Sequence, residues 1–227
     1  TLVINQSQDS VSILLNNGDG TFATKVDYTV GDGPFSIDVA DFNKDGFTDV
    51  AVANATDASV SILLNNGDGT FAAKTDYIAG TATYSISASD FDNDGDIDIA
   101  TANSGDSTVS ILLNNGNGTF AAKVDYVSGT NPYSITSADL DNDGDIDIAT
   151  ANTGDPSMSI LFNNGNGTFA TNINYVTGTN PYSIVTADFD KDGDIDISVV
   201  NAGYDTLSVY RNNGNGTFAT KIDYATG

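Results

Sequence analysis

The chain has 227 residues and a formal net charge of −24, because 7 Lys and Arg stand against 31 acidic residues, all of them Asp. This charge disfavours nucleic acids and anionic membrane surfaces as partners, and the apolar runs are too short to span a bilayer. The absence of Cys and His excludes disulfides and disfavours zinc and copper sites.

A unit of 49 residues repeats along the chain without insertion or deletion. The phrase NNG-x-GTF occurs five times, with its first glycine at Gly18, Gly67, Gly116, Gly165 and Gly214. An acidic phrase occurs four times at the same spacing, starting at Asp41, Asp90, Asp139 and Asp188. The chain therefore holds about 4.6 copies of one unit, which indicates a repeat architecture.

The chain begins inside a unit, since Thr1 aligns with Val50, and residues 1–30 contain strands two to four of a partial unit. Each later unit is predicted to contain four strands, which in the third full unit span 132–139, 146–152, 157–163 and 169–176. These segments are rich in Ile, Val, Tyr, Thr and Ser and alternate in part between apolar and polar residues. The Asn and Gly residues between strands three and four favour a hairpin turn. We expect almost no helix.

Four short antiparallel strands in each 49-residue repeat predict an all-β fold, a β-propeller of four-stranded antiparallel blades. One domain would span 1–227, with a partial blade at 1–30 and full blades at 31–79, 80–128, 129–177 and 178–227. Two arrangements fit this count: five blades with one incomplete, or a segment of a larger propeller. A β-solenoid is the rival fold, although its coils are usually shorter. The first strand of each unit is rich in Ser and Ala, which suits the crowded strand nearest a propeller axis.

The acidic phrase follows the pattern D-x-[DN]-x-D-G-x-x-D, which predicts a calcium loop. Calcium takes about six to eight oxygen ligands, and carboxylates at positions 1, 3 and 5 of a tight loop converge on one point. Gly at position 6 permits the sharp turn, and the carbonyl at position 7 and the carboxylate at position 9 complete the shell. The predicted ligands of the four sites, counting the carbonyl of each seventh residue, are Asp41, Asn43, Asp45, Phe47 and Asp49; Asp90, Asp92, Asp94, Asp96 and Asp98; Asp139, Asp141, Asp143, Asp145 and Asp147; and Asp188, Asp190, Asp192, Asp194 and Asp196.

The alternative interpretation of these loops is a set of solvated Asp-Gly turns, which four copies in register disfavour. Magnesium fits less well than calcium, because it demands octahedral geometry and keeps its waters. We expect the first loop to bind most weakly, since Asn43 removes a charge and Lys44 adds a positive one. At about 2 mM free calcium and a dissociation constant of about 0.1 mM, each site contributes about 1.8 kcal/mol and four contribute about 7 kcal/mol. Such weak sites would be empty in the cytosol, which predicts an extracellular or cell-surface protein.

The acidic phrase followed by NNGDGTF resembles the FG-GAP/VCBS repeats, the calcium-binding blades of integrin-α-like propellers. The resemblance covers essentially the whole chain. The proline-aromatic pair of that family is matched by Pro34-Phe35, Pro132-Tyr133 and Pro181-Tyr182, whereas the second unit has Thr83-Tyr84. Propellers of this family usually have seven blades, more than this chain can supply. The resemblance implies extracellular adhesion or ligand binding, including carbohydrate binding, or a place as an accessory module of a larger surface protein or enzyme.

These observations lead to a leading hypothesis and two alternatives. The first is an extracellular, calcium-stabilised propeller that binds carbohydrate or surface-protein ligands as a lectin or adhesin, without catalysis. The second is a structural module of a surface adhesin or fibre that self-associates through its incomplete blade. The third is an accessory domain of a secreted hydrolase or lyase. We expect no enzyme activity, since the chain lacks His, Cys and Glu, and its Asp clusters are assigned to calcium.

Repeated aromatic residues have two interpretations, stacking on sugar rings or packing between blades, and packing is the more common role. They recur in the fourth strand of each unit and at the start of the first strand, at Tyr28, Tyr77, Tyr126, Tyr175 and Tyr224 and at Tyr84, Tyr133 and Tyr182. The clearest breaks in the repeat are residues 56–60 and residues 201–214, and the latter segment contains Arg211, the only arginine. A unique site would be sought there first.

Overall fold

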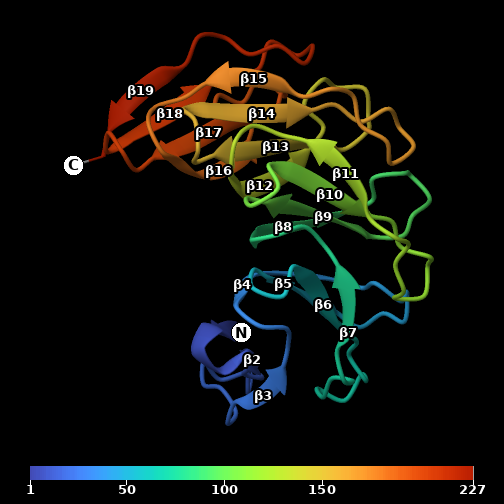
Figure 1. Ribbon diagram of the computed structural model, residues 1–227. Coiled ribbons are helices and arrows are strands. Elements are labelled where there is room, and N and C mark those ends of the chain that lie inside the picture. The colour runs from blue at the N-terminus through green and yellow to red at the C-terminus, as the bar shows by residue number, and fades with distance from the viewer. Residues whose placement is uncertain (227) are drawn as a thin grey trace.

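In the computed structural model, which describes residues 1–226, the chain forms five antiparallel β-sheets (Figure 1). The first sheet has three strands, β1 (Leu2–Asn5), β2 (Ser10–Ile13) and β3 (Val26–Thr29), with a 3-10 helix at Gln6–Gln8 between the first two. The second contains β4 (Pro34–Ala40), β5 (Asp49–Asn54), β6 (Ser59–Leu63) and β7 (Thr75–Ile78). The third contains β8 (Thr83–Ser89), β9 (Asp98–Asn103), β10 (Thr108–Leu112) and β11 (Val124–Val127). The last two contain β12 (Pro132–Ala138), β13 (Asp147–Asn152), β14 (Ser157–Leu161) and β15 (Ile173–Val176), then β16 (Pro181–Ala187), β17 (Asp196–Asn201), β18 (Thr206–Tyr210) and β19 (Ile222–Ala225).

The strands follow one another in order within every sheet, as the sequence predicts. The predicted strand at 169–176 is too long, because β15 begins only at Ile173. Phe169 makes an isolated bridge with Asn163, and the residues between them form a turn in which Gly165 and Gly167 have positive φ values of 77° and 71°. The Asn and Gly residues thus form the predicted turn. The segments on either side of the turn are paired through the single bridge between Asn163 and Phe169.

The inner strands β4, β8, β12 and β16 lie side by side, and the sheets radiate from them in an arc (Figure 1). Apolar cores fill the spaces between neighbouring sheets. The core between the third and fourth sheets joins Ala102, Val109 and Ile111 to Ile148 and Leu161, all of them at most 1% exposed. Among the described residues, the first and last sheets do not pack against each other as neighbours do, and no helix is long and apolar enough to cross a membrane.

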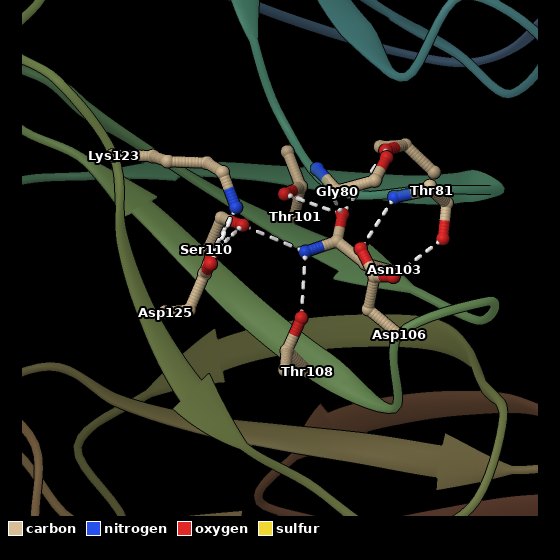
Figure 2. Close-up of polar contacts among 10 residues, drawn as sticks. Gly80, Thr81, Thr101, Asn103, Asp106, Thr108, Ser110, Lys123 and Asp125 are labelled. Atoms are coloured by element: carbon tan, nitrogen blue, oxygen red, sulfur yellow. Dashed lines mark hydrogen bonds and ion pairs between the residues drawn. The ribbon is translucent and has the colours of Figure 1, made fainter.

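A polar network crosses each four-stranded sheet from its second to its fourth strand, as Figure 2 shows for the third sheet. Asn103 donates through Nδ2 to Ser110 Oγ at 2.7 Å and to Thr108 Oγ1 at 3.2 Å. Ser110 donates to Asp125 Oδ1 at 2.6 Å, and Lys123 Nζ pairs with the same carboxylate. In the fourth sheet, Asn172 and Asn174 stand in place of the Lys and Asp of this ion pair. Asn172 Nδ2 donates to Asn174 Oδ1 at 2.9 Å, so a neutral hydrogen bond replaces the charged one.

We expect Ser110→Ala to lower the free energy of unfolding by about 1–3 kcal/mol, because it leaves the buried amide of Asn103 without this partner and removes the hydrogen bond to Asp125. Ser110 is fully buried, whereas Ser7 is exposed and serves as the control, for which Ser7→Ala should change stability by less than about 0.5 kcal/mol. Urea denaturation of both variants measures the difference. Equal stability of the two variants would show that the network contributes nothing to stability.

Candidate metal centre

The acidic loops connect the first and second strands of the second, third, fourth and fifth sheets. Their hydrogen bonds explain why the pattern contains Asp and Gly at fixed positions. In the third sheet, Asp90 Oδ2 accepts a hydrogen bond from the Gly95 amide at 2.9 Å, and Asp94 Oδ1 accepts one from the Asp96 amide at 2.8 Å. Gly95 has a φ of +84°, a conformation that favours glycine. The same bonds recur in the other loops and hold the carboxylates on the inside of the turn.

Three of the four loops bring three carboxylates together. In each, one oxygen from each residue lies within 4.8 Å of the other two, and the groups are Asp90, Asp92 and Asp94; Asp139, Asp141 and Asp147; and Asp188, Asp190 and Asp196. Positions 1 and 3 are common to all three groups, while the third member is position 5 in one loop and position 9 in the others. Asp98, Asp143 and Asp192 lie outside these groups.

The first loop gathers no such group among the described residues, and its third position is occupied by Asn43. Asn43 Nδ2 donates to Asp45 Oδ2 at 2.9 Å, so the amide occupies an oxygen of a predicted ligand within the loop. Lys44 reaches away from this loop and pairs with Asp96 of the next one at 2.5 Å. That the first loop is the weakest metal site stays a prediction.

The residues of the three groups fit a hard cation. Asp90 Oδ1 is buried and has no hydrogen-bond partner, so a buried carboxylate oxygen is left with its charge uncompensated. Burial raises the pKa of Asp98 and Asp147 to about 7, and neighbouring carboxylates add to the rise. Burial likewise raises the pKa of Asp92, Asp141 and Asp190. Carboxylate oxygens crowded in this way are the donors that calcium prefers, and a bound cation would favour their charged forms.

The Asp at position 9 also braces the sheet. Asp147 is fully buried at the start of β13, where Oδ2 accepts from the Leu140 amide at 2.9 Å and Oδ1 accepts from the Asn163 amide at 2.8 Å. One carboxylate therefore joins the acidic loop to the hairpin between the third and fourth strands. Asp49, Asp98 and Asp196 make the equivalent two bonds.

The first Asn of each NNG phrase is a residue whose role the sequence did not reveal. Asn163 Nδ2 donates to the Ile146 carbonyl of its own loop at 3.0 Å and to the Phe91 carbonyl of the preceding sheet's loop at 2.8 Å. Asn114 and Asn212 form the same two bonds. In the sequence, the NNG phrase predicts only a turn. The one sign that its first Asn also bridges loops is that this Asn is the same in all five copies of the phrase.

Neighbouring acidic loops are also joined directly through their side chains. Position 4 of one loop contacts the position 7 carboxylate of the next: Asn93 Nδ2 donates to Asp145 Oδ1 and Asn142 Nδ2 to Asp194 Oδ1, both at 2.7 Å. The Lys44–Asp96 pair is the charged version of this contact. The side chains at position 7, where only the carbonyl was predicted to act, therefore link the loops into one row.

We expect Asn163→Ala to lower the free energy of unfolding by about 2–3 kcal/mol, because it removes two hydrogen bonds from buried carbonyls. Asn16 is the matched control at the same repeat position in the first sheet. It is exposed and accepts one local bond, from the Gly18 amide, so Asn16→Ala should cost about 0.5 kcal/mol or less. Denaturant unfolding in calcium compares the two, and equal losses would refute the bridging role.

The aromatic residues at the start of the inner strands form a row at the end opposite the acidic loops. Ring centroids lie 4.8 Å apart for Phe35 and Tyr84, 4.8 Å for Tyr84 and Tyr133, and 4.4 Å for Tyr133 and Tyr182. The Tyr133 and Tyr182 hydroxyls are 2.7 Å apart, and Tyr182 is 46% exposed. Beside Phe35 lies an open hollow of about 600 Å³, lined also by Ile4, Asn5, Gln6, Ser7 and Gln8.

Four of the five tyrosines of the fourth strands pack between sheets, which is the more common role, whereas Tyr224 of the last sheet is 50% exposed. Tyr77 contacts Phe120 edge-on at 5.3 Å, and Tyr126 contacts Phe169 at 5.4 Å. Tyr28 and Tyr175 make the same contact. These tyrosines therefore belong to the interfaces between sheets, whereas the inner-strand aromatics form a separate surface.

The fold and the loops define a class of protein: an all-β repeat protein whose sheets carry acidic loops with the donors for metal ions. The FG-GAP-like repeat family matches residues 1–52, 41–101, 90–150 and 139–199, and the chain belongs to this family. The resemblance drawn from the acidic and NNG phrases is thus confirmed. A search of curated proteins finds no match to the sequence.

Solved structures share the fold at low sequence identity. A lectin of Agrocybe aegerita that recognises non-reducing terminal N-acetylglucosamine is 19% identical, with a TM-score of 0.52 over 95% of this chain and 74% of the lectin. A catalytically inactive virginiamycin B lyase from Staphylococcus aureus, solved with quinupristin, is 11% identical, with a TM-score of 0.66 over 99% of this chain and 66% of the lyase. At these identities the likeness extends to the fold alone.

Proposed function

We propose that this chain is a calcium-stabilised β-propeller module that binds carbohydrate or surface-protein ligands outside the cell, without catalysing a reaction. The observation that carries the proposal is the set of three carboxylate groups, one of which contains the buried, unpartnered Asp90 Oδ1. The side-by-side inner strands, with sheets radiating from them, support the propeller assignment.

Calcium would serve this module by holding the acidic loops closed. In each site the carboxylates at positions 1, 3, 5 and 9 would hold the ion, with Asn43 in place of one of them in the first loop. When bound, the ion supplies positive charge that offsets the repulsion among the Asp residues. Millimolar calcium outside cells suits sites of the affinity expected for extracellular modules, which supports the extracellular location.

The aromatic row supports carbohydrate as the ligand class. Tyr182 presents an exposed ring, and the adjoining hollow beside Phe35 is lined by the amide side chains of Asn5, Gln6 and Gln8. An exposed ring at one end of the row and a hollow with amide donors and acceptors at the other match the needs of a neutral sugar chain, which stacks on rings and hydrogen-bonds to amides. The lectin that shares the fold gives a precedent for sugar recognition on such a scaffold.

Two features of the chain support a binding role without catalysis. The sequence lacks His, Cys and Glu, which most often serve as general bases or nucleophiles, and its clustered Asp residues repeat nearly unchanged from unit to unit. The surface-protein ligand remains the alternative within the same proposal, since an exposed aromatic row also suits protein contacts.

A glycan-array screen of the purified chain, in millimolar calcium and again in chelator, tests the proposal. We expect binding in calcium that is lost in chelator and falls roughly tenfold in Tyr182→Ala, since an aromatic contact contributes up to about 1.5 kcal/mol. Tyr204, which is 69% exposed and outside the row, provides the control Tyr204→Ala, expected to bind as the unmodified chain does. Absence of binding in both buffers, with the chain folded, would exclude a glycan ligand among those tested and favour the surface-protein alternative.

A further inference from the structure

The chain contains eight Asn-Gly pairs, all of them in the NNG-x-GTF turns. An Asn before Gly is prone to deamidation, because a Gly without a side chain leaves its backbone nitrogen open to attack the Asn side chain. We call the pair inside each NNG phrase a first pair, and the pair that follows it in the last three turns a second pair. The first pairs begin at Asn17, Asn66, Asn115, Asn164 and Asn213, and the second pairs begin at Asn117, Asn166 and Asn215.

The first pairs are held in a way that opposes the reaction. In the third sheet the Gly116 amide donates to Asn114 Oδ1 at 3.0 Å, and Asn115 Nδ2 donates to Thr119 Oγ1 at 3.0 Å and to the Thr119 carbonyl at 3.1 Å. The nitrogen that would attack and the nitrogen that would leave are therefore both engaged. The same Gly-to-Asn bond and the same Asn-to-Thr bond occur in the other four turns.

The second pairs have the opposite arrangement. Asn117 is exposed, and within residues 1–226 neither its Nδ2 nor the Gly118 amide donates a hydrogen bond. Its Oδ1 instead accepts two bonds from Thr119, from the amide at 3.0 Å and from Oγ1 at 2.6 Å. This oxygen becomes negative when a nitrogen attacks Cγ, so the two donors stabilise the charge that develops. Asn215 is exposed and accepts the same two bonds from Thr217.

Asn166 differs from the other second pairs in one bond. Its Oδ1 accepts from the Thr168 amide and Oγ1 in the same way, but the Gly167 amide donates to the Phe91 carbonyl of the preceding sheet at 2.9 Å. The attacking nitrogen is engaged there, so Asn166 should react more slowly than its two counterparts.

We propose that Asn117, Asn166 and Asn215 are sites of spontaneous deamidation in the folded chain, and that the first pairs are protected from it. The Gly nitrogen loses its proton to solvent and attacks Cγ, Nδ2 takes up a proton and leaves as ammonia, and a succinimide ring forms. Water then opens the ring at either carbonyl, which gives Asp or isoaspartate. Water is consumed and ammonia is released, so the reaction needs no further reactant.

The first two turns show that this fold accepts the Asp product. Asp19 stands at the repeat position of Asn117, and its Oδ1 accepts from the Thr21 amide at 2.9 Å and from Thr21 Oγ1 at 2.6 Å. Asp68 makes the same two bonds with Thr70. Isoaspartate adds a methylene to the main chain, so the isoaspartate product should not keep this turn.

The second pairs lie beside the acidic loops. A Cβ added at Gly118 would lie 3.3 Å from the Asn43 Cβ, and one added at Gly167 would lie 3.2 Å from the Asp92 Cβ. Deamidation therefore adds a carboxylate at the edge of a loop that already gathers Asp residues, and the charge at that edge increases as the chain ages.

Peptide mass spectrometry of the purified, folded chain during incubation at mildly alkaline pH tests the proposal. Conversion replaces NH by oxygen and raises the mass of the peptide by a dalton, and fragment ions locate the converted residue. We expect Asn117 and Asn215 to convert first, Asn166 several-fold more slowly, and the Asn residues of the first pairs to stay unconverted over the same period. In urea, which removes the hydrogen bonds of the turns, all eight pairs should convert at comparable rates.

Thr119 offers a matched pair of variants. Thr119→Val removes the Oγ1 donor and should slow conversion of Asn117 by roughly tenfold. Thr119→Ser keeps a hydroxyl and should convert as the unmodified chain does, and Asn215 should convert at the same rate in both variants as an internal control. An unchanged rate at Asn117 in Thr119→Val would overturn the role given to the hydroxyl.

The unmodified chain alone decides the main claim. First pairs that convert as fast as second pairs in the folded chain, or the same order of conversion in buffer and in urea, would overturn the proposal. It would also be overturned if Asn117 and Asn215 stayed unconverted in the folded chain over a period in which the unfolded chain converts completely.

Discussion

Chelation of calcium is expected to lower the melting temperature of this chain by about 10–20 °C. At about 2 mM free calcium and a dissociation constant of about 0.1 mM, each of the three carboxylate groups would contribute about 1.8 kcal/mol, or about 5 kcal/mol together. For a domain of this size, 1 kcal/mol shifts the melting temperature by about 2–4 °C. Thermal unfolding followed by circular dichroism, in calcium and in excess chelator, measures the shift.

Two comparisons make the result specific to these sites. Magnesium added in place of calcium should restore less of the stability, because magnesium demands octahedral geometry and keeps its waters. Asp141→Asn removes a ligand from one group and should reduce the calcium-dependent shift by about one third while leaving the other two groups intact. Identical melting in calcium and chelator would contradict the stabilising role given to the metal.

Asp147→Ala is expected to lower the free energy of unfolding by about 3–5 kcal/mol in calcium. The substitution leaves the buried amides of Leu140 and Asn163 without their acceptor, at about 1–3 kcal/mol each, and removes a predicted metal ligand. In chelator the ligand contribution vanishes but the two amides still lack a partner, so a loss of about 2 kcal/mol or more should remain. Denaturant unfolding in both buffers separates the two roles.

Asp32 provides the control for this experiment. It is exposed and no hydrogen bond to its carboxylate is present among residues 1–226, so Asp32→Ala should change stability by less than about 0.5 kcal/mol in either buffer. If Asp147→Ala destabilises the chain in calcium but not in chelator, the residue acts through the metal alone and the bracing role is wrong.

The repeat, the strand content and the acidic loops could be predicted from the sequence because each depends on neighbours along the chain. A hairpin turn needs Asn and Gly at adjacent positions, and a calcium loop needs carboxylates at alternate positions of one short segment, as at Asp90, Asp92 and Asp94. The family followed from the same phrases. The strand predicted at 169–176 was too long, since its composition favours a strand but its ladder with the third strand ends at the pair of Ile160 and Ile173, with one isolated bridge beyond it.

Contacts between sheets could not be predicted from the sequence, because they join residues of different units. Asn163 meets the Phe91 carbonyl 72 positions away, and Asn93 meets Asp145 52 positions away. A turn-forming Asn and a bridging Asn look alike in sequence, and only the stacking of sheets distinguishes them.

The sequence by itself determined that this is an all-β repeat protein with acidic loops, since local spacing fixes strands, turns and carboxylate clusters. Only the tertiary structure decided which Asp residues brace the sheets, which Asn residues join them, and which apolar faces stay uncovered. Phe22 and Phe189 occupy repeat positions whose other members are buried, so their exposure depends on whether a neighbouring sheet covers them. Burial of a repeated side chain is a property of the stack of sheets and not of the unit that contains it.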